Sequence, residues 1–187
     1  MLRRTLIAGA LVCAMCGPWR MLRAASAQGV WLNVPFIRQV EDGCGSASLA
    51  MVMQYWQGKQ GFAATPASDA AAIQRALYAP SAHGIYATAM KQYLEQHGFR
   101  AFTVAGDMEL LEHHLEKGRP LIVALQPEKG TPLHYVVVVG ADPARKLVLV
   151  NDPQQRKLLK QDASVFVKQW KATGNWTLLA VPAESAH

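Results

Sequence analysis

Apolar residues in the first half of the chain recur with the period of an α-helix. The clearest pattern begins near Gly45 and ends at Gly58. Its apolar residues fall at positions i, i+3, i+4 and i+7: Leu49, Val52, Met53 and Trp56. This spacing places an apolar stripe along a helix, and glycine commonly ends such a pattern. We predict three further helices, over residues 69–78, 83–99 and 106–120.

Beyond residue 120 the period changes from that of a helix to that of a strand. Short β-branched apolar runs, bounded by Gly, Pro and Asp, occupy residues 121–127, 133–140, 146–152 and 175–182. Runs that are apolar on both faces are typical of buried strands. An earlier extended segment, residues 30–40, contains Pro35, which confines it to the edge of a sheet. Helices followed by antiparallel strands predict an α+β fold.

The first 27 residues have the features of a secretory signal peptide. Arg3 and Arg4 precede an apolar run of about a dozen residues, and small residues stand before an expected cleavage site after Ala27. We therefore expect residues 1–27 to be removed. Residues 28–187 then form a single domain that is exported to the periplasm or outside the cell.

Removal of the signal peptide changes the charge of the protein. The segment contains four arginines and no acids, so the formal net charge of +6 falls by four to +2. Little positive charge remains to bind phosphates, and no nucleic-acid partner is expected. No run in the mature chain approaches the ~20 apolar residues that a membrane helix needs, so we expect no membrane span there. We expect a monomer.

Cys44 is the one cysteine in residues 28–187, although exported proteins normally pair their cysteines. It stands between Gly43 and Gly45, directly before the first predicted helix. A small buried core residue is one explanation, since unpaired cysteines are often buried. A nucleophile is the other, because the partial positive charge at a helix N-terminus favours a thiolate. The flanking glycines leave room for other groups to approach, which favours the nucleophile.

A nucleophilic cysteine needs a base, and His134 is the best-placed histidine. It begins a strand predicted to be buried, and the next strand ends in Asp152. If residues 141–145 form the turn, the hairpin is centred near Pro143 and His134 lies opposite Asp152. Opposed side chains share a face, about 5 Å apart at Cβ, so the carboxylate would orient the imidazole. A surface ion pair and a one-residue slip in register are the alternatives.

The remaining histidines fit structural roles better. His113 and His114 are expected on a solvated helix face among acids, and His97 at a helix C-terminus, where the helix dipole favours it. His83 lies in a predicted loop and has no assigned role. A lone cysteine with scattered histidines supplies no zinc ligand set, so neither a metal nor a cofactor is expected.

An oxyanion hole would complete the catalytic machinery. The backbone N–H of Cys44 is a natural donor because it begins a helix. Gln39 is the amide side chain just upstream that is able to reach the site. Glu41 and Asp42 are acceptors when ionised and would oppose a developing oxyanion.

Several segments of the chain resemble papain-like cysteine peptidases, specifically the bacteriocin-processing (double-glycine) peptidase group and its stand-alone secreted members. They are "VPFIRQVEDGCGSASLAMVMQYW", "KGRPLIVAL", "LHYVVVVG", "VLVNDP" and "SVFVKQW". The resemblance implies a papain-like fold, with N-terminal helices packed on a C-terminal antiparallel β-sheet. It also implies that Cys44 is the nucleophile, His134 the base and Asp152 its orienting acid. Gln39 would be the oxyanion side chain, although in the family the glutamine usually stands one residue further from the cysteine.

The expected function is that of an exported cysteine peptidase, which hydrolyses peptide bonds through a Cys-His-Asp triad and a thioester. Its partner would be a peptide or protein substrate. One alternative keeps the triad in a cell-wall amidase or endopeptidase, or in an acyl transferase. Another is a non-catalytic peptide-binding or assembly domain of the same fold. Transporter-linked members of the group carry membrane spans and an ATPase, so cleavage of double-glycine leaders during export is not carried over.

Overall fold

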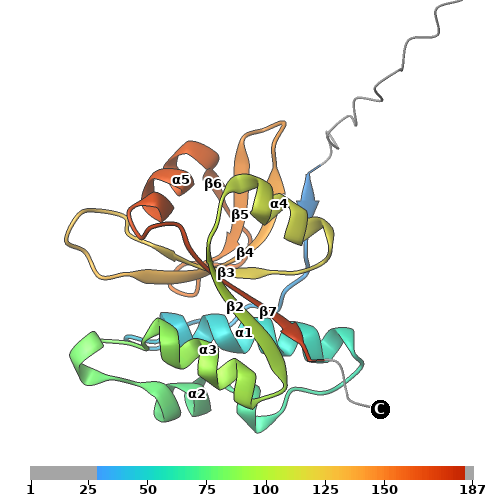
Figure 1. The fold of residues 1–187 in the computed structure, drawn as a ribbon, viewed down its shortest axis with the longest axis vertical. Coiled ribbons are helices and arrows are strands. Elements are labelled where there is room, and N and C mark those ends of the chain that lie inside the picture. The colour runs from blue at the N-terminus through green and yellow to red at the C-terminus, as the bar shows by residue number, and fades with distance from the viewer. Residues whose placement is uncertain (1–28, 184–187) are drawn as a thin grey trace, which may run out of the picture.

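Residues 29–183 are described by a computed structural model, in which helices cover both faces of one antiparallel sheet (Figure 1). The predicted signal peptide lies outside the described residues. The α-helices are α1 (Cys44–Lys59), α2 (Ala70–Leu77), α3 (Ala87–Gln96), α4 (Met108–Glu116) and α5 (Ala163–Lys171). Short 3₁₀ helices occupy Pro66–Ser68 and Pro80–Ala82.

The strands form a single sheet in which every neighbouring pair is antiparallel. They are β1 (Val30–Trp31), β2 (Phe99–Ala105), β3 (Leu121–Leu125), β4 (His134–Asp142), β5 (Leu147–Asn151), β6 (Leu159–Asp162) and β7 (Trp176–Pro182). The order across the sheet is β2-β7-β3-β4-β5-β6, and β1 pairs with the far end of β4. The predicted α+β class is confirmed.

The central strands are apolar on both faces because both faces are covered. Successive side chains of a strand point to opposite sides of the sheet. In β4, Val137 and Val139 pack with the core formed by α1, α2 and α3, whereas Val136 and Val138 pack with the core of α4 and α5. Figure 1 shows α1, α2 and α3 on one side of the sheet, with α4 and α5 on the other. This double cover holds β4, and the histidine at its start, in a rigid frame.

Helix α1 is buried more deeply than a single apolar stripe predicts. It starts and ends within one residue of the expected bounds, and every residue from Gly45 to Met53 is buried. The hydroxyl of Ser48 donates to the carbonyl oxygen of Tyr135 at 3.3 Å, which ties the helix to the start of β4. The helix N-terminus is thereby fixed next to His134.

Besides the two short 3₁₀ helices, two strands and one α-helix were not predicted from the sequence: β2, β6 and α5. Strand β2 lies at the edge of the sheet and buries only Phe99 and Ala101, so its apolar alternation is weak. Helix α5 buries only Phe166 and Trp170, four residues apart, which is too few to mark a helix by period. The predicted helix over residues 83–99 is shorter at both ends, because its first residues form a turn and its last begins β2.

Within residues 29–183, no helix combines the length and apolar character required to cross a membrane.

Gly140 lets β1 lie directly against β4. A Cβ atom at Gly140 would lie 2.6 Å from the carbonyl oxygen of Val30 and 2.9 Å from the Cβ of Trp31. We therefore expect Gly140→Ala to displace β1 and to lower the free energy of unfolding by about 1–3 kcal/mol, as overpacking does. Urea denaturation followed by circular dichroism would measure the change.

The matched control for this substitution is Gly58→Ala, near the exposed end of α1. A Cβ atom there would meet nothing within 4 Å. Because alanine favours a helix over glycine, Gly58→Ala should raise the free energy of unfolding by up to about 1 kcal/mol. Equal effects of the two substitutions would contradict the close packing of β1 on Gly140.

Candidate active site

Cys44 is the first residue of α1, where the N-terminal segment, residues 29–43, turns into the helix. The turn is tight: the N–H of Gly43 donates to the carbonyl of Val40 at 3.0 Å, and Asp42 adopts a left-handed φ of 55°. A Cβ atom at Gly43 would lie only 3.0 Å from that same carbonyl oxygen, so glycine fits best there. Cys44 is half-buried, packing against the core on one side and lining a cleft on the other.

The four predicted site residues lie together around one cleft of about 430 Å³. They come from the N-terminal segment, the start of α1, the start of β4 and the turn after β5: Gln39, Cys44, His134 and Asp152. The loop between β3 and β4 forms another part of the wall, with Leu133 half-exposed beside His134. Glutamine side chains also line the cleft: Gln154, Gln155, Gln161 and Gln169.

His134 lies between the carboxylate and the thiol. Its Nε2 atom donates to Oδ1 of Asp152 at 2.8 Å, and the side chain of Cys44 lies close enough to raise the pKa of the imidazole. The side chain of His134 is 17% exposed and that of Asp152 only 3%. Since Nε2 is used by the carboxylate, Nδ1 is the ring nitrogen that serves the sulfur.

The contact between His134 and Asp152 forms through a different register from the predicted one. The expected turn would place the two residues directly opposite each other, but Val137 pairs with Asn151, a shift of two residues. The turn occupies residues 143–146 and is therefore one residue shorter and centred later than predicted, and a bulge near Gly140 changes the register again. Because side chains alternate with a period of two, the shift leaves both residues on the same face. Asp152 follows the end of β5 and reaches His134 diagonally.

Both oxygen atoms of the Asp152 carboxylate are hydrogen-bonded. Besides His134, Oδ1 accepts from the backbone N–H groups of Gln154 at 2.9 Å and Gln155 at 3.3 Å. Oδ2 accepts from the side-chain Nε2 of Gln155 at 2.8 Å. Burial alone would raise the pKa of Asp152, but the hydrogen bond and charge of His134, with these backbone N–H groups, hold it below its ordinary value. The carboxylate is therefore ionised at neutral pH.

His134 carries a positive charge at neutral pH. Burial lowers the pKa of its imidazole, but the hydrogen bonds and negative charges of Asp152 and Cys44 outweigh burial and raise it to about 9. An imidazolium held between a carboxylate and a sulfur is the arrangement that stabilises a thiolate nucleophile.

Gln39 points into the same cleft from the N-terminal segment. Its backbone N–H donates to the carbonyl of Pro153 at 3.0 Å, next to Asp152. Its side-chain Oε1 is buried and has no hydrogen-bond partner within residues 29–183. The amide group is therefore not fully occupied by the protein.

Asp42 and His83 also line the cleft, although the sequence assigns neither a role there. The hydroxyl of Tyr78 donates to Oδ2 of Asp42 at 3.0 Å, and Nδ1 of His83 lies 3.5 Å from the same oxygen. Their partners are about 40 residues away in the chain, so no local pattern indicates this cluster. Gln155 was missed as well, and the one signal near it is the turn-forming Asp-Pro pair that precedes it.

The sequence profile of the Peptidase_C39 like family matches residues 31–178, which include all four predicted site residues. The chain belongs to the Peptidase_C39 like family. This C39-like peptidase is thus a cysteine peptidase by class, and the resemblance noted in the sequence is confirmed. No curated protein matches the chain.

Solved structures similar to this C39-like peptidase share its fold. A double-glycine-motif protease of an AMS/PCAT transporter, solved with a leader peptide, is 24% identical, with a TM-score of 0.62 over 82% of this chain and 95% of that one. The peptidase domain of Streptococcus ComA, a bifunctional ABC transporter of a quorum-sensing pathway, is 22% identical. Its TM-score is 0.61 over 78% of this chain and 96% of that one. At these identities the likeness supports the papain-like fold alone.

Three other histidines of this C39-like peptidase do not line the cleft at Cys44: His97, His113 and His114. His113 is exposed as predicted, but His114 is half-buried, and burial together with the charge of Arg119 lowers its pKa. His97 ends α3, where its Nδ1 lies 2.7 Å from the carbonyl oxygen of Tyr93. No group of three or more metal-binding side chains occurs in the described part of the chain.

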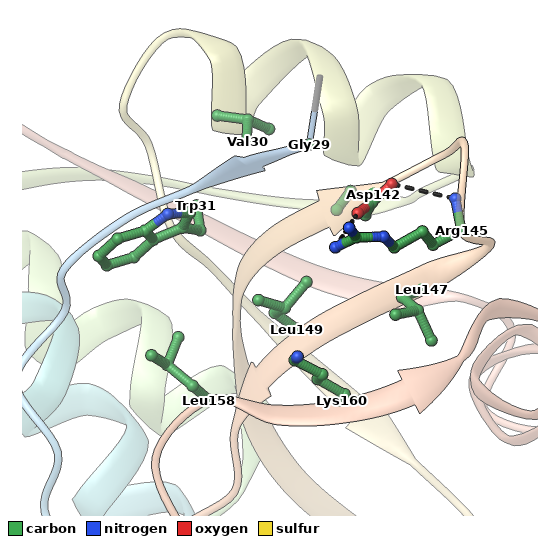
Figure 2. A pocket seen from close by; sticks show the side chains of 10 residues that line it. Gly29, Val30, Trp31, Asp142, Arg145, Leu147, Leu149, Leu158 and Lys160 are labelled. Carbon is green, nitrogen blue, oxygen red and sulfur yellow. Dashed lines mark hydrogen bonds and ion pairs between the residues drawn. The ribbon is translucent and has the colours of Figure 1, made fainter. Parts of the chain in front are cut away.

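A second hollow, of about 390 Å³, lies on the sheet beside β1 (Figure 2). Its lining includes four large apolar side chains: Trp31, Leu147, Leu149 and Leu158. At one end of the hollow, Figure 2 shows an ion pair between Arg145 and Asp142, in which Nη1 lies 3.6 Å from Oδ2. Its lining contains none of the four predicted site residues. This second hollow is therefore separate from the cleft at Cys44.

The charge on His134 should make stability fall from neutral to alkaline pH. The pKa of His134 is about 9 in the folded protein against 6.5 for an ordinary histidine, so folding holds a proton that the unfolded chain releases. This stabilisation is complete below about pH 6.5 and is lost as the pH rises through about 9. We expect the free energy of unfolding to fall by roughly 3 kcal/mol between pH 6.5 and 9.5, measured by urea denaturation.

Asp152→Asn should reduce this pH dependence, because the pKa of His134 falls when the neighbouring charge is removed. His113→Gln is the control, since that histidine is exposed and should leave the pH dependence unchanged. If Asp152→Asn kept the full wild-type dependence, the ion pair would not be the source of the raised pKa.

Proposed function

We propose that this cysteine peptidase is exported and that it cleaves peptide bonds through a Cys44-His134-Asp152 triad and a thioester intermediate. The observation that supports the proposal is that the three residues line one cleft, where His134 is hydrogen-bonded to Asp152 and both Asp152 and Cys44 raise the pKa of its imidazole. Asp152 orients the ring through Nε2, which leaves Nδ1 to exchange a proton at the sulfur side. Membership of the Peptidase_C39 like family supports the same chemistry.

In the acylation step, the thiolate of Cys44 attacks the carbonyl carbon of the substrate and forms a carbon–sulfur bond. The electron pair of the carbonyl moves to its oxygen. The imidazolium of His134 then gives its Nδ1 proton to the amine nitrogen as the carbon–nitrogen bond breaks. The product is a thioester on Cys44, a released amine and a neutral imidazole.

In the deacylation step, neutral His134 takes a proton from a water molecule that attacks the thioester carbon. The carbon–sulfur bond breaks, so the acid product leaves and the thiolate of Cys44 returns. Asp152 stays ionised throughout and stabilises the imidazolium at both ends of the cycle.

The oxyanion of both steps would be bound by two donors. The N–H of Cys44 is one of the first N–H groups of α1, which have no acceptor within the helix. The side-chain Nε2 of Gln39, which lines the cleft, is the other. The helix N-terminus adds a favourable field for the negative charge.

We infer that the substrate is an extended peptide or a protein, bound by one copy of the chain. The cleft is open and mostly uncharged apart from the catalytic groups, Asp42 and His83, which suits a main chain more than a charged ligand. A related double-glycine-motif protease has been solved in complex with a leader peptide, which supports peptide binding by this fold.

Cys44→Ala should abolish hydrolysis of fluorescently labelled casein, because no other nucleophile replaces the sulfur. Gln39→Ala should lower kcat about 10²- to 10³-fold, as the loss of one oxyanion donor does, and some activity should remain measurable. Gln92→Ala, on an exposed face of α3, is the control and should match the wild type.

Casein cleavage that survives Cys44→Ala would exclude the peptidase mechanism. The same proteins are incubated with purified cell wall. Release of wall peptides without casein cleavage would assign the triad to cell-wall crosslinks in place of protein substrates.

Export is proposed from residues 1–27, which have the features of a signal peptide. Expression of the full chain in a bacterial host should place the protein outside the cytoplasm, with Gln28 as its first residue. N-terminal sequencing of the periplasmic and culture fractions tests this. Recovery of the intact chain from the cytoplasm alone would contradict export.

A further inference from the structure

The carboxylate of Asp152 is held by a residue outside the triad. The side chain of Gln155 folds back so that its Nε2 donates to Oδ2 at 2.8 Å. Oδ1 is already taken by His134 and by two backbone N–H groups. Gln155 is therefore the one side chain that binds the second oxygen within residues 29–183.

The backbone of Gln155 is in turn held from the N-terminal segment. The guanidinium of Arg38 donates to the carbonyl oxygens of Gln154 at 3.2 Å and of Gln155 at 3.0 Å. One residue on, the N–H of Gln39 donates to the carbonyl of Pro153 at 3.0 Å. Three hydrogen bonds thus join the turn after Asp152 to the segment that carries Gln39.

This arrangement fixes the plane of the carboxylate. A carboxylate bound through Oδ1 alone can rotate about its Cβ–Cγ bond, and rotation would move Oδ1 off the line to Nε2 of His134. A donor on Oδ2 removes that freedom. The amide of Gln155 also stabilises the charged form of an acid that is almost wholly buried.

We propose that Gln155 is a positioning residue of the peptidase: its amide orients Asp152 for His134, and Arg38 holds the backbone of Gln155 in place for that contact. The inference rests on the proposed triad. It adds two residues outside the triad, which act on the reaction through Asp152.

A purely structural role for the turn is the competing explanation, and the pH dependence of Cys44 reactivity separates the two. Alkylation by iodoacetamide requires the thiolate, which the imidazolium of His134 stabilises, and that imidazolium depends on ionised Asp152. The charged group that acts on Asp152 is His134 from β4, which Cys44 from α1 influences in turn, while Arg38 from the N-terminal segment contacts the backbone of the turn after Asp152. The acid limb of the profile is the low-pH range in which the alkylation rate rises with pH. Loss of the amide donor raises the pKa of Asp152, so this acid limb moves to higher pH.

The experiment measures the rate of Cys44 alkylation from pH 4 to pH 9 on the purified full chain, with peptide mass mapping to separate Cys44 from Cys13 and Cys16. Gln155→Met keeps the size of the side chain and removes the donor. Its acid limb should rise by about one pH unit, a tenfold loss of rate on that limb. Gln155→Glu, which adds a charge beside Asp152, should raise it further. Gln92→Met is the control and should coincide with the wild type.

Arg38→Met should also move the acid limb to higher pH. The double variant, Arg38→Met with Gln155→Met, should move it no further than Gln155→Met alone, because both residues act through the same carboxylate. Thermal melting of each variant checks that the exposed positions leave the fold intact. Acid limbs that coincide with the wild type would overturn the inference. A rate lowered equally at every pH would also overturn it, since that is the signature of a structural role.

His134→Gln distinguishes failure of this inference from failure of the proposed function. If His134→Gln moves the acid limb up to the range of an ordinary thiol, near pH ~8.5, while the Gln155 variants keep it in place, the triad stands and the role of Gln155 is refuted. If His134→Gln leaves the alkylation profile unchanged, the catalytic pair itself is refuted, and the role of Gln155 with it.

Discussion

The site depends on one buried charge, the carboxylate of Asp152. A carboxylate shielded from water is costly by several kcal/mol unless its oxygen atoms are hydrogen-bonded and its charge is paired. Here His134 supplies the opposite charge, and the turn after β5 supplies the other donors. The same interaction keeps His134 protonated at neutral pH, so the charge state of the pair with Cys44 follows from how Asp152 is buried.

The rigid parts of the fold bring Cys44 and His134 to one cleft, and an irregular part, the turn after β5, positions Asp152 beside His134. Strand β4 is fixed because both of its faces are packed, and Ser48 ties it to α1, so the sulfur and the imidazole have a constant spacing. Asp152 comes from a turn, which has no such packing. Hydrogen bonds to the N-terminal segment take its place, and they make the position of Gln39 and that of Asp152 interdependent.

Much of the fold, and the grouping of the four site residues, could be predicted from the amino-acid sequence alone. The long buried helix at Cys44 and the apolar strands have strong periods, and both were found close to their true bounds. Strand β2 and helix α5 were missed because each buries only two large side chains or fewer along its length. The hairpin register was wrong by two residues, since neither the turn length nor the bulge near Gly140 leaves a mark in the sequence. The predicted contact between His134 and Asp152 still forms, because a shift by an even number of residues leaves each side chain on the same face of the sheet.

The residues that could not be predicted are those whose partners are far away in the chain. Arg38 and Gln155 are exposed and polar, and their side chains match those of ordinary surface residues. The bonds of Arg38 go to backbone carbonyls more than a hundred residues on, which carry no side-chain identity for a pattern to reveal. A nucleophile and its histidine are recognisable by residue type because their chemistry demands those atoms. A residue that only holds the acid in place needs a donor at the right point in space, and the fold alone determines which residue provides it.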